Sequence, residues 1–141
     1  MKKVYVSCCF FFTLLCSLYG YTSEMNYSSI ANDLSKVSYF SVGMNGFIGK
    51  YSKGENDVRD ILKSKNATEI FLTIANNPEA TSESKLYVAC GLKQLGKINN
   101  KDVKSIFEKE LGNNVSTLKA DILRREKFKD IYFGILKHGC L

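Results

Sequence analysis

Few side chains in this chain of 141 residues could catalyse a reaction or hold a metal ion, and only one of them is a histidine. His138 lies two positions before Cys140, a spacing that does not by itself bring the imidazole against the sulfur. Metal sites and cysteine–histidine catalysis both need several such groups at one point. The sequence therefore predicts no metal site, no cofactor and no thiol chemistry, and His138 is expected to be an exposed tail residue.

The acidic residues do not indicate an active site either. General acid–base catalysis by carboxylates needs two acids in one cleft. Glu108 and Glu110 are two positions apart and do not share a helical face. The acids between positions 121 and 130 stand among basic residues, which we expect to pair with them. These patterns favour a protein that is not an enzyme.

A cluster of glycines predicts a surface loop. Glycine occurs at positions 43, 46, 49 and 54, and this residue permits turns that other residues resist. The spacing lacks the four-residue gap and the Gly-Lys-Ser/Thr ending of a phosphate-binding loop. The segment also carries apolar anchors at Phe47 and Ile48, and three residues suited to contact an acidic partner: Lys50, Tyr51 and Lys53.

The opening segment has the layout of a secretory signal peptide. Two lysines precede an apolar run over positions 4–19, which is shorter than the roughly 20 residues that a membrane-spanning helix needs. We predict a signal peptide over residues 1–22, cleaved after Gly20 or Thr22, and a mature domain over residues 23–141 without a stable membrane anchor. An uncleaved anchor, a buried N-terminal helix and a lipid on Cys16 are the alternatives.

Export also predicts the state of the cysteines. Three of the five cysteines lie in the signal peptide, and Cys90 and Cys140 remain as an even pair. Cysteine pairs in an oxidising compartment usually form disulfides. We therefore predict a Cys90–Cys140 disulfide that closes a loop of about 50 residues. Two buried free thiols are the alternative.

The mature domain is basic. The chain has 20 basic and 14 acidic residues, and loss of Lys2 and Lys3 leaves 18 against 14, a net charge of about +4. The densest basic block covers positions 124–129. Such a block is most often a solvated face, but it could also bind an acidic protein site, an anionic membrane or a wall polymer. Export argues against nucleic acid as the partner.

Apolar residues recur mostly at helical spacing. The pattern predicts a helix over about 23–40, two short helices after Ser52 and Asn66, the most buried helix from Ser82 to Gly96, and another from Asn100 to Gly112. Residues 115–138 fit either helix or strand, and we favour helix. The predicted fold class is mainly α, a single compact helical domain after the signal peptide, with one disulfide.

The chain resembles bacteriocin immunity proteins over its whole length. The resemblance lies in the lysine-rich start, the glycine cluster, residues 84–92 (Ser-Lys-Leu-Tyr-Val-Ala-Cys-Gly-Leu) and the closing His-Gly-Cys-Leu. It implies a periplasmic protein that protects the producing cell by neutralising a bacteriocin with a lysozyme-like muramidase domain. The resemblance assigns no role to any individual residue.

The charge of the domain suits such a partner, because a muramidase cleft is lined by acids. We expect the glycine-rich loop to enter that cleft through Lys50, Tyr51 and Lys53, with a second contact patch formed by Arg124, Arg125 and Lys127. The alternative function is an exported structural or envelope-binding protein that docks on wall polymer or anionic lipid.

Overall fold

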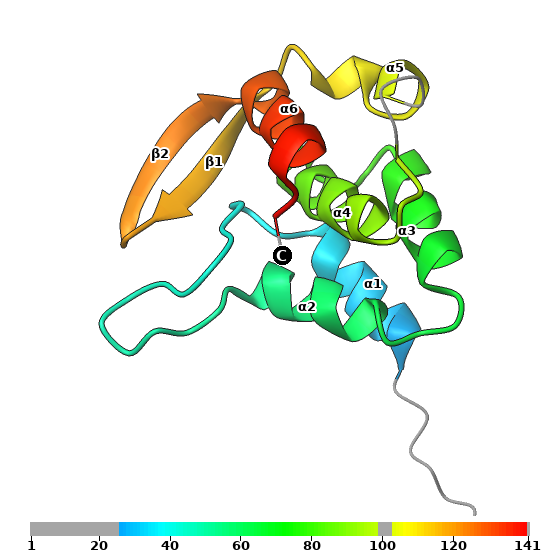
Figure 1. Cartoon of the computed structure of the whole chain (residues 1–141), viewed down its shortest axis with the longest axis horizontal. Helices are drawn as coiled ribbons and strands as arrows, with labels where there is room; N and C mark the ends of the chain where they lie inside the picture. The colour runs from blue at the N-terminus through cyan, green and yellow to red at the C-terminus, as the bar shows by residue number, and fades with distance from the viewer. Residues whose placement is uncertain (1–25, 99–102, 141) are drawn as a thin grey trace, which may run out of the picture.

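The computed structural model describes residues 26–98 and 103–140 (Figure 1). The predicted signal peptide over residues 1–22, and the domain boundary after it, lie outside this part of the chain. The elements in chain order are α1 (Tyr27–Ser35), α2 (Lys53–Ile61), α3 (Ala67–Asn76), α4 (Ser82–Gln94), α5 (Val103–Ile106), the 3-10 turn η1 (Glu108–Glu110), β1 (Asn114–Lys119), β2 (Ile122–Lys127) and α6 (Phe128–His138). No helix within residues 26–98 and 103–140 is both long enough and apolar enough to span a membrane.

Helix α4 forms the centre of the molecule, as the sequence predicts. Its residues 84–92 are all buried, and α2, α3, α6 and β1 pack around it. A Cβ atom added at Gly91 would lie 2.3 Å from the ring of Phe71, so glycine is required for the close approach of α3. The hydroxyl of Thr81 accepts a hydrogen bond from the backbone N–H of Ser84 at 3.0 Å and caps the helix, one position before the predicted cap.

The first two helices follow their local signals in part. Helix α2 begins after Ser52, whose hydroxyl accepts a hydrogen bond from the N–H of Glu55 at 3.1 Å, as its capping pattern predicts. Helix α1 ends at Ser35, earlier than predicted, because the chain beyond it becomes extended and pairs with β1. The N–H of Phe40 donates to the carbonyl of Ser116 at 2.8 Å.

The prediction of a mainly α domain was wrong, because residues 114–127 form a two-stranded antiparallel hairpin and the fold is mixed α/β. Tertiary contacts stabilise the extended form. Val115 and Thr117 are buried, the segment at Phe40 pairs with the free edge of β1, and the carboxylate of Glu83 accepts a hydrogen bond from the N–H of Ser116 at 2.8 Å. Residues 128–138 are helical, as favoured by the sequence.

A disulfide joins Cys90, on the buried face of α4, to Cys140, which follows the end of α6. This is the predicted pairing. The bond ties the last residues of the described chain to its centre, and the two Cα atoms are 5.7 Å apart. Helix α6 therefore has covalent support at its C-terminal end, in addition to the packing of its buried aromatic residues, Phe128 and Tyr132, against Phe107.

Candidate functional site

The segment between α1 and α2 projects away from the helical body (Figure 1). We call residues 43–51 the glycine loop. Asn45 and Lys50 exchange both backbone hydrogen bonds, at 2.8 and 3.0 Å, so the two sides of the loop form a short ladder. Gly46 and Gly49 close its tip with φ values of +71° and +64°, which glycine adopts without the strain that a side chain would cause.

A buried group of hydroxyls holds the base of the glycine loop. The hydroxyl of Tyr87, on α4, accepts a hydrogen bond from the N–H of Ser41 at 2.8 Å and lies 2.8 Å from the hydroxyl of Ser52. Burial raises the pKa of Tyr87 to about 12, although hydrogen bonds to Ser52 and Ser41 act in the opposite direction. The phenol therefore stays protonated at neutral pH and links both ends of the loop to the most buried helix.

A buried carboxylate supports the same base. Glu55 is 1% exposed, and its side chain accepts hydrogen bonds from the N–H of Gly43 at 2.7 Å and from Arg59 at 2.7 Å. The hydrogen bond to Glu55 raises the pKa of Arg59 despite some desolvation. The guanidinium of Arg59 also lies over the ring of Tyr51, 4.6 Å from its centroid. Both ends of the glycine loop are thus fixed to α2.

The tip of the glycine loop exposes large apolar side chains. Phe47 is 106% exposed, so its ring does not pack against the rest of the described chain. Of the seven large hydrophobic residues that are exposed in the described chain, six lie on this loop or on the β1–β2 hairpin: Met44, Phe47, Ile48, Tyr51, Ile122 and Leu123. Side chains of this kind rarely cluster in solvent without a partner to cover them.

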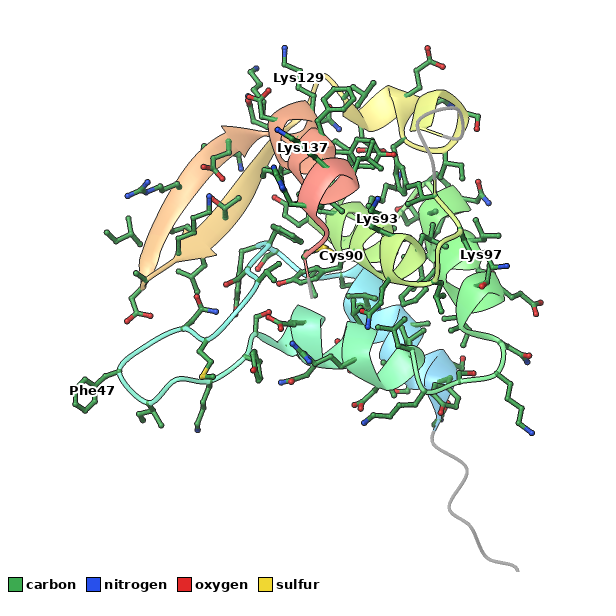
Figure 2. The ribbon with its side chains drawn as sticks, in the orientation of Figure 1. Phe47, Cys90, Lys93, Lys97, Lys129 and Lys137 are labelled. Atoms are coloured by element: carbon green, nitrogen blue, oxygen red, sulfur yellow. A yellow bond between two sulfur atoms is a disulfide. The ribbon has the colours of Figure 1, made fainter. Side chains whose placement is uncertain are left out.

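The glycine loop and the hairpin extend on the same side of the molecule (Figure 1). A Cβ atom at Gly46 would lie 3.6 Å from a carboxylate oxygen of Asp121, so the tips of the two segments are in contact. Phe47 lies at the outer end of this projection in Figure 2. We call the glycine loop and the hairpin together the two-loop face, and it is the candidate binding site.

The structure separates the three predicted contact residues of the loop. Lys50 is exposed, and Tyr51 is 39% exposed beside Arg59. Lys53 is the first residue of α2, and its ammonium lies 3.0 Å from carboxylates of both Asp33 and Asp57. Desolvation lowers the pKa of Lys53, but its hydrogen bonds to the two carboxylates raise it further, so the net shift is upward.

The second predicted patch lies on β2. Arg124, Arg125 and Lys127 are all exposed. Arg125 donates to the hydroxyl of Ser116 at 3.1 Å, across the hairpin. None of the three forms an ion pair with a residue that the structure describes. The fold therefore brings Lys50 and the hairpin cations to one side of the molecule, although they are more than 70 positions apart in the sequence.

Sequence reasoning did not assign a binding role to the apolar tips. Phe47 and Ile48 were recognised only as anchors of the loop, Ile122 and Leu123 were interpreted as part of a helical spacing, and Met44 was given no role. The signal in the loop was large apolar residues placed between closely spaced glycines, where no helix or strand could bury them. The hairpin gave no comparable signal. Residues 122–127 lack the alternation of apolar and polar residues that indicates a strand, and they were expected to be helical.

Other basic residues lie away from this face. Lys97 lies just beyond the C-terminal end of α4, on the opposite side of the view from Phe47, and Lys93, near that end of the helix, lies closer to the centre (Figure 2). Among residues 26–98 and 103–140, no group of three histidine, cysteine or acidic side chains is arranged to hold a metal ion.

In the comparisons with known proteins, no family model, no curated protein and no solved structure matches the chain.

Proposed function

We propose that this protein is an exported immunity protein that binds and neutralises a peptidoglycan-cleaving bacteriocin, pesticin, in the periplasm. The resemblance to bacteriocin immunity proteins suggests the class of partner. The observation that carries the proposal is the two-loop face, a projecting surface with a fixed base, exposed apolar tips, and cations (Lys50, Arg124, Arg125 and Lys127) that form no ion pair with a described residue. These properties suit binding rather than catalysis.

The proposed mechanism is occlusion of the toxin's cleft. A muramidase holds a glycan strand between two catalytic carboxylates, so its cleft is both concave and acidic. The glycine loop is convex, and Lys50 with the hairpin cations gives it the opposite charge. Opposite charges accelerate the encounter and orient the two proteins. A bound loop would exclude the glycan without any chemical step.

Charge reversal on the two-loop face tests the proposal. Lys50 and Arg124 are suitable positions because neither forms an ion pair with a described residue. The double variant Lys50→Glu/Arg124→Glu should bind purified pesticin at least 10-fold more weakly in calorimetric titration. Lys53 is left unchanged, because a glutamate there would face Asp33 and Asp57 and destabilise the fold.

The variant Lys93→Glu/Lys97→Glu is the matched control, since it changes the net charge equally but away from Phe47 and the two-loop face. Its affinity should stay within about threefold of the unmodified protein. Equal losses for both pairs would reduce the interaction to net charge and contradict binding through the two-loop face. Absence of any binding by the unmodified protein would contradict the immunity function itself.

Protection of cells tests the compartment. A susceptible strain should survive pesticin when it produces the full chain, and should die when it produces residues 23–141 alone, because the toxin acts on the wall outside the cytoplasm. Equal protection by both forms would contradict periplasmic action. A pull-down on purified peptidoglycan without toxin separates this function from wall binding, since an immunity protein should remain in the supernatant.

A further inference from the structure

We propose that the apolar tips of the two-loop face anchor the complex, with Phe47 entering an apolar-walled pocket inside an acid-rimmed cleft of the partner protein. The surrounding apolar contacts come from the neighbouring tip residues: Met44, Ile48, Ile122 and Leu123. This inference rests on the proposed function and deepens it. It assigns the main binding contribution to side chains other than the cations that sequence reasoning selected.

The distribution of exposed apolar side chains is the first argument. Six of the seven large exposed hydrophobics of the described chain belong to two segments that are distant in sequence and adjacent in space. Apart from Phe133 on α6, the large apolar residues elsewhere in the described chain are buried or half-buried, and Phe71, Phe107 and Phe128 are fully enclosed. Phe47 and Ile48 are 106% and 77% exposed, so neither side chain contributes appreciably to folding. A role in recognition explains their presence at this one place.

The fixed base of the glycine loop is the second argument. The hydrogen bonds from the backbone of Ser41 and Gly43 to Tyr87 and Glu55 hold the loop at its start, and the Asn45–Lys50 ladder holds it near the tip. None of these bonds involves the side chain of Phe47. The ring is therefore presented by a preorganised backbone, which reduces the entropy lost on binding. A tip of this kind suits a concave protein pocket.

The arrangement of charge identifies the chemistry of the partner. The apolar side chains of the tips are flanked by cations, because Lys50 and Arg124 lie on the segments behind them. Asp121, at the hairpin turn, is the acidic side chain nearest to the loop tip. A complementary surface has an apolar interior and an acidic rim. Aromatic and arginine residues at such central positions commonly dominate binding energy.

Substitution of single tip residues tests the inference. Phe47→Ser should weaken binding to purified pesticin on the order of 100-fold, and Ile48→Ser on the order of 10-fold. Phe133→Ser is the matched control, because Phe133 is also an exposed phenylalanine, at 53%, but lies on α6. Its affinity should change by less than about threefold. Circular dichroism of each variant checks that the fold is retained.

Each outcome of this titration has a distinct meaning. If the unmodified protein binds and Phe47→Ser binds equally well, the apolar anchor is overturned and the proposed function stands. If the unmodified protein does not bind, both proposals are overturned. Equal losses for Phe47→Ser and Phe133→Ser would also overturn the anchor, because the effect would then not be specific to the tip.

Two other occupants of the apolar tips are tested in parallel. Flotation with vesicles of phosphatidylglycerol and phosphatidylethanolamine measures docking on anionic lipid, and sedimentation measures self-association. The protein should stay unbound and monomeric in both experiments. Vesicle binding that is lost in Phe47→Ser would replace the protein partner with a membrane, and a dimer that is lost in Phe47→Ser would replace it with a second copy of the chain.

Discussion

The surroundings of α4 and the two-loop face use the same residue types in opposite ways. Around α4, aromatic rings are enclosed, and the buried ion pair of Lys85 and Glu110, at 2.6 Å, is completed by hydrogen bonds from Ser82 and Asn113 to Glu110. On the two-loop face, aromatic and aliphatic side chains are exposed and the arginines have no acidic partners among the described residues. The interior encloses its aromatic rings and pairs its buried charges, whereas the projecting face leaves such groups exposed to another molecule.

This contrast separates stability from recognition. The group around Tyr87 connects the two regions, because it is buried in the core and also holds the base of the glycine loop. Substitutions around α4 should therefore reduce the free energy of unfolding, and substitutions at the tips should reduce binding alone.

The disulfide should give the largest effect on stability. The double variant Cys90→Ala/Cys140→Ala should lose about 4 kcal/mol of unfolding free energy, because the bond closes a 50-residue separation and restricts the unfolded chain. Urea unfolding measures the loss. Reduction of the unmodified protein with dithiothreitol should lower its stability to nearly the same value, and an unmodified protein that is insensitive to reductant would contradict the bond.

The buried ion pair should give the next largest effect. Burial alone raises the pKa of the Glu110 carboxyl, but hydrogen bonds from Lys85, Ser82 and Asn113 outweigh it, so the pKa is lowered. Lys85→Met removes the cation and leaves a buried carboxylate unpaired, which should cost roughly 3 kcal/mol at pH 7. Urea unfolding at pH 7 checks this, and the loss should be smaller at pH 4, where Glu110 takes up a proton more readily in the variant. A loss independent of pH would contradict an electrostatic cause.

The sequence signals worked where local interactions decide the structure and failed where tertiary contacts do. Helices α2 and α4 were predicted because a capping residue and an apolar face suffice to specify them. The residues of strand β2 do not alternate between apolar and polar types, and its positions 122–125 are all exposed. It becomes a strand through pairing with β1, and β1 is extended because it pairs with the segment at Phe40. No local pattern carries that information.

The sequence predicted the separate parts of the candidate site but not how the fold brings them together. Glycine spacing located the loop, and charge density located the hairpin cations, but their approach through Gly46 and Asp121 depends on the fold. Lys53 was assigned to the loop, although the cap at Ser52 starts α2 directly before it and two carboxylates pair with its ammonium. Whether a charge is free cannot be inferred from one sequence, because its partners come from other elements.

Alkaline pH should destabilise the protein through Tyr87. Its pKa is about 12 in the fold against 10.0 for the free side chain, so this contribution to stability is complete below pH 10 and is lost as pH rises from about 10 to about 12. At pH 11 the loss should be on the order of 1 kcal/mol. Urea unfolding at pH 9 and pH 11 measures it. Tyr87→Phe should be less stable than the unmodified protein at both pH values. Its stability should nevertheless fall less between pH 9 and pH 11, by on the order of 1 kcal/mol, because the lysine titrations are common to both proteins. Equal losses would show that Tyr87 does not titrate in this range.

The hairpin turn can be improved by a single substitution. Ala120 and Asp121 adopt φ values of +47° and +64°, a left-handed conformation that asparagine tolerates better than alanine does. Ala120→Asn should raise the unfolding free energy by roughly 0.5–1 kcal/mol in thermal or urea unfolding. Ala120→Val should have the opposite sign, because a β-branched residue resists positive φ. A destabilising asparagine would contradict this turn geometry.

The smallest expected effect on stability belongs to Phe47. Its ring is fully exposed and lies outside the hydrogen bonds that hold the loop, so Phe47→Ser should change the unfolding free energy by less than about 0.5 kcal/mol. Urea unfolding measures this change, and Phe71→Ser is the comparison variant. Phe71 is a completely buried residue of α3 that packs against Gly91, so its substitution should cost roughly 3–5 kcal/mol. A large loss of unfolding free energy for Phe47→Ser would mean that the ring packs on the protein itself. The contrast between the enclosed residues around α4 and the exposed two-loop face would then not hold at Phe47.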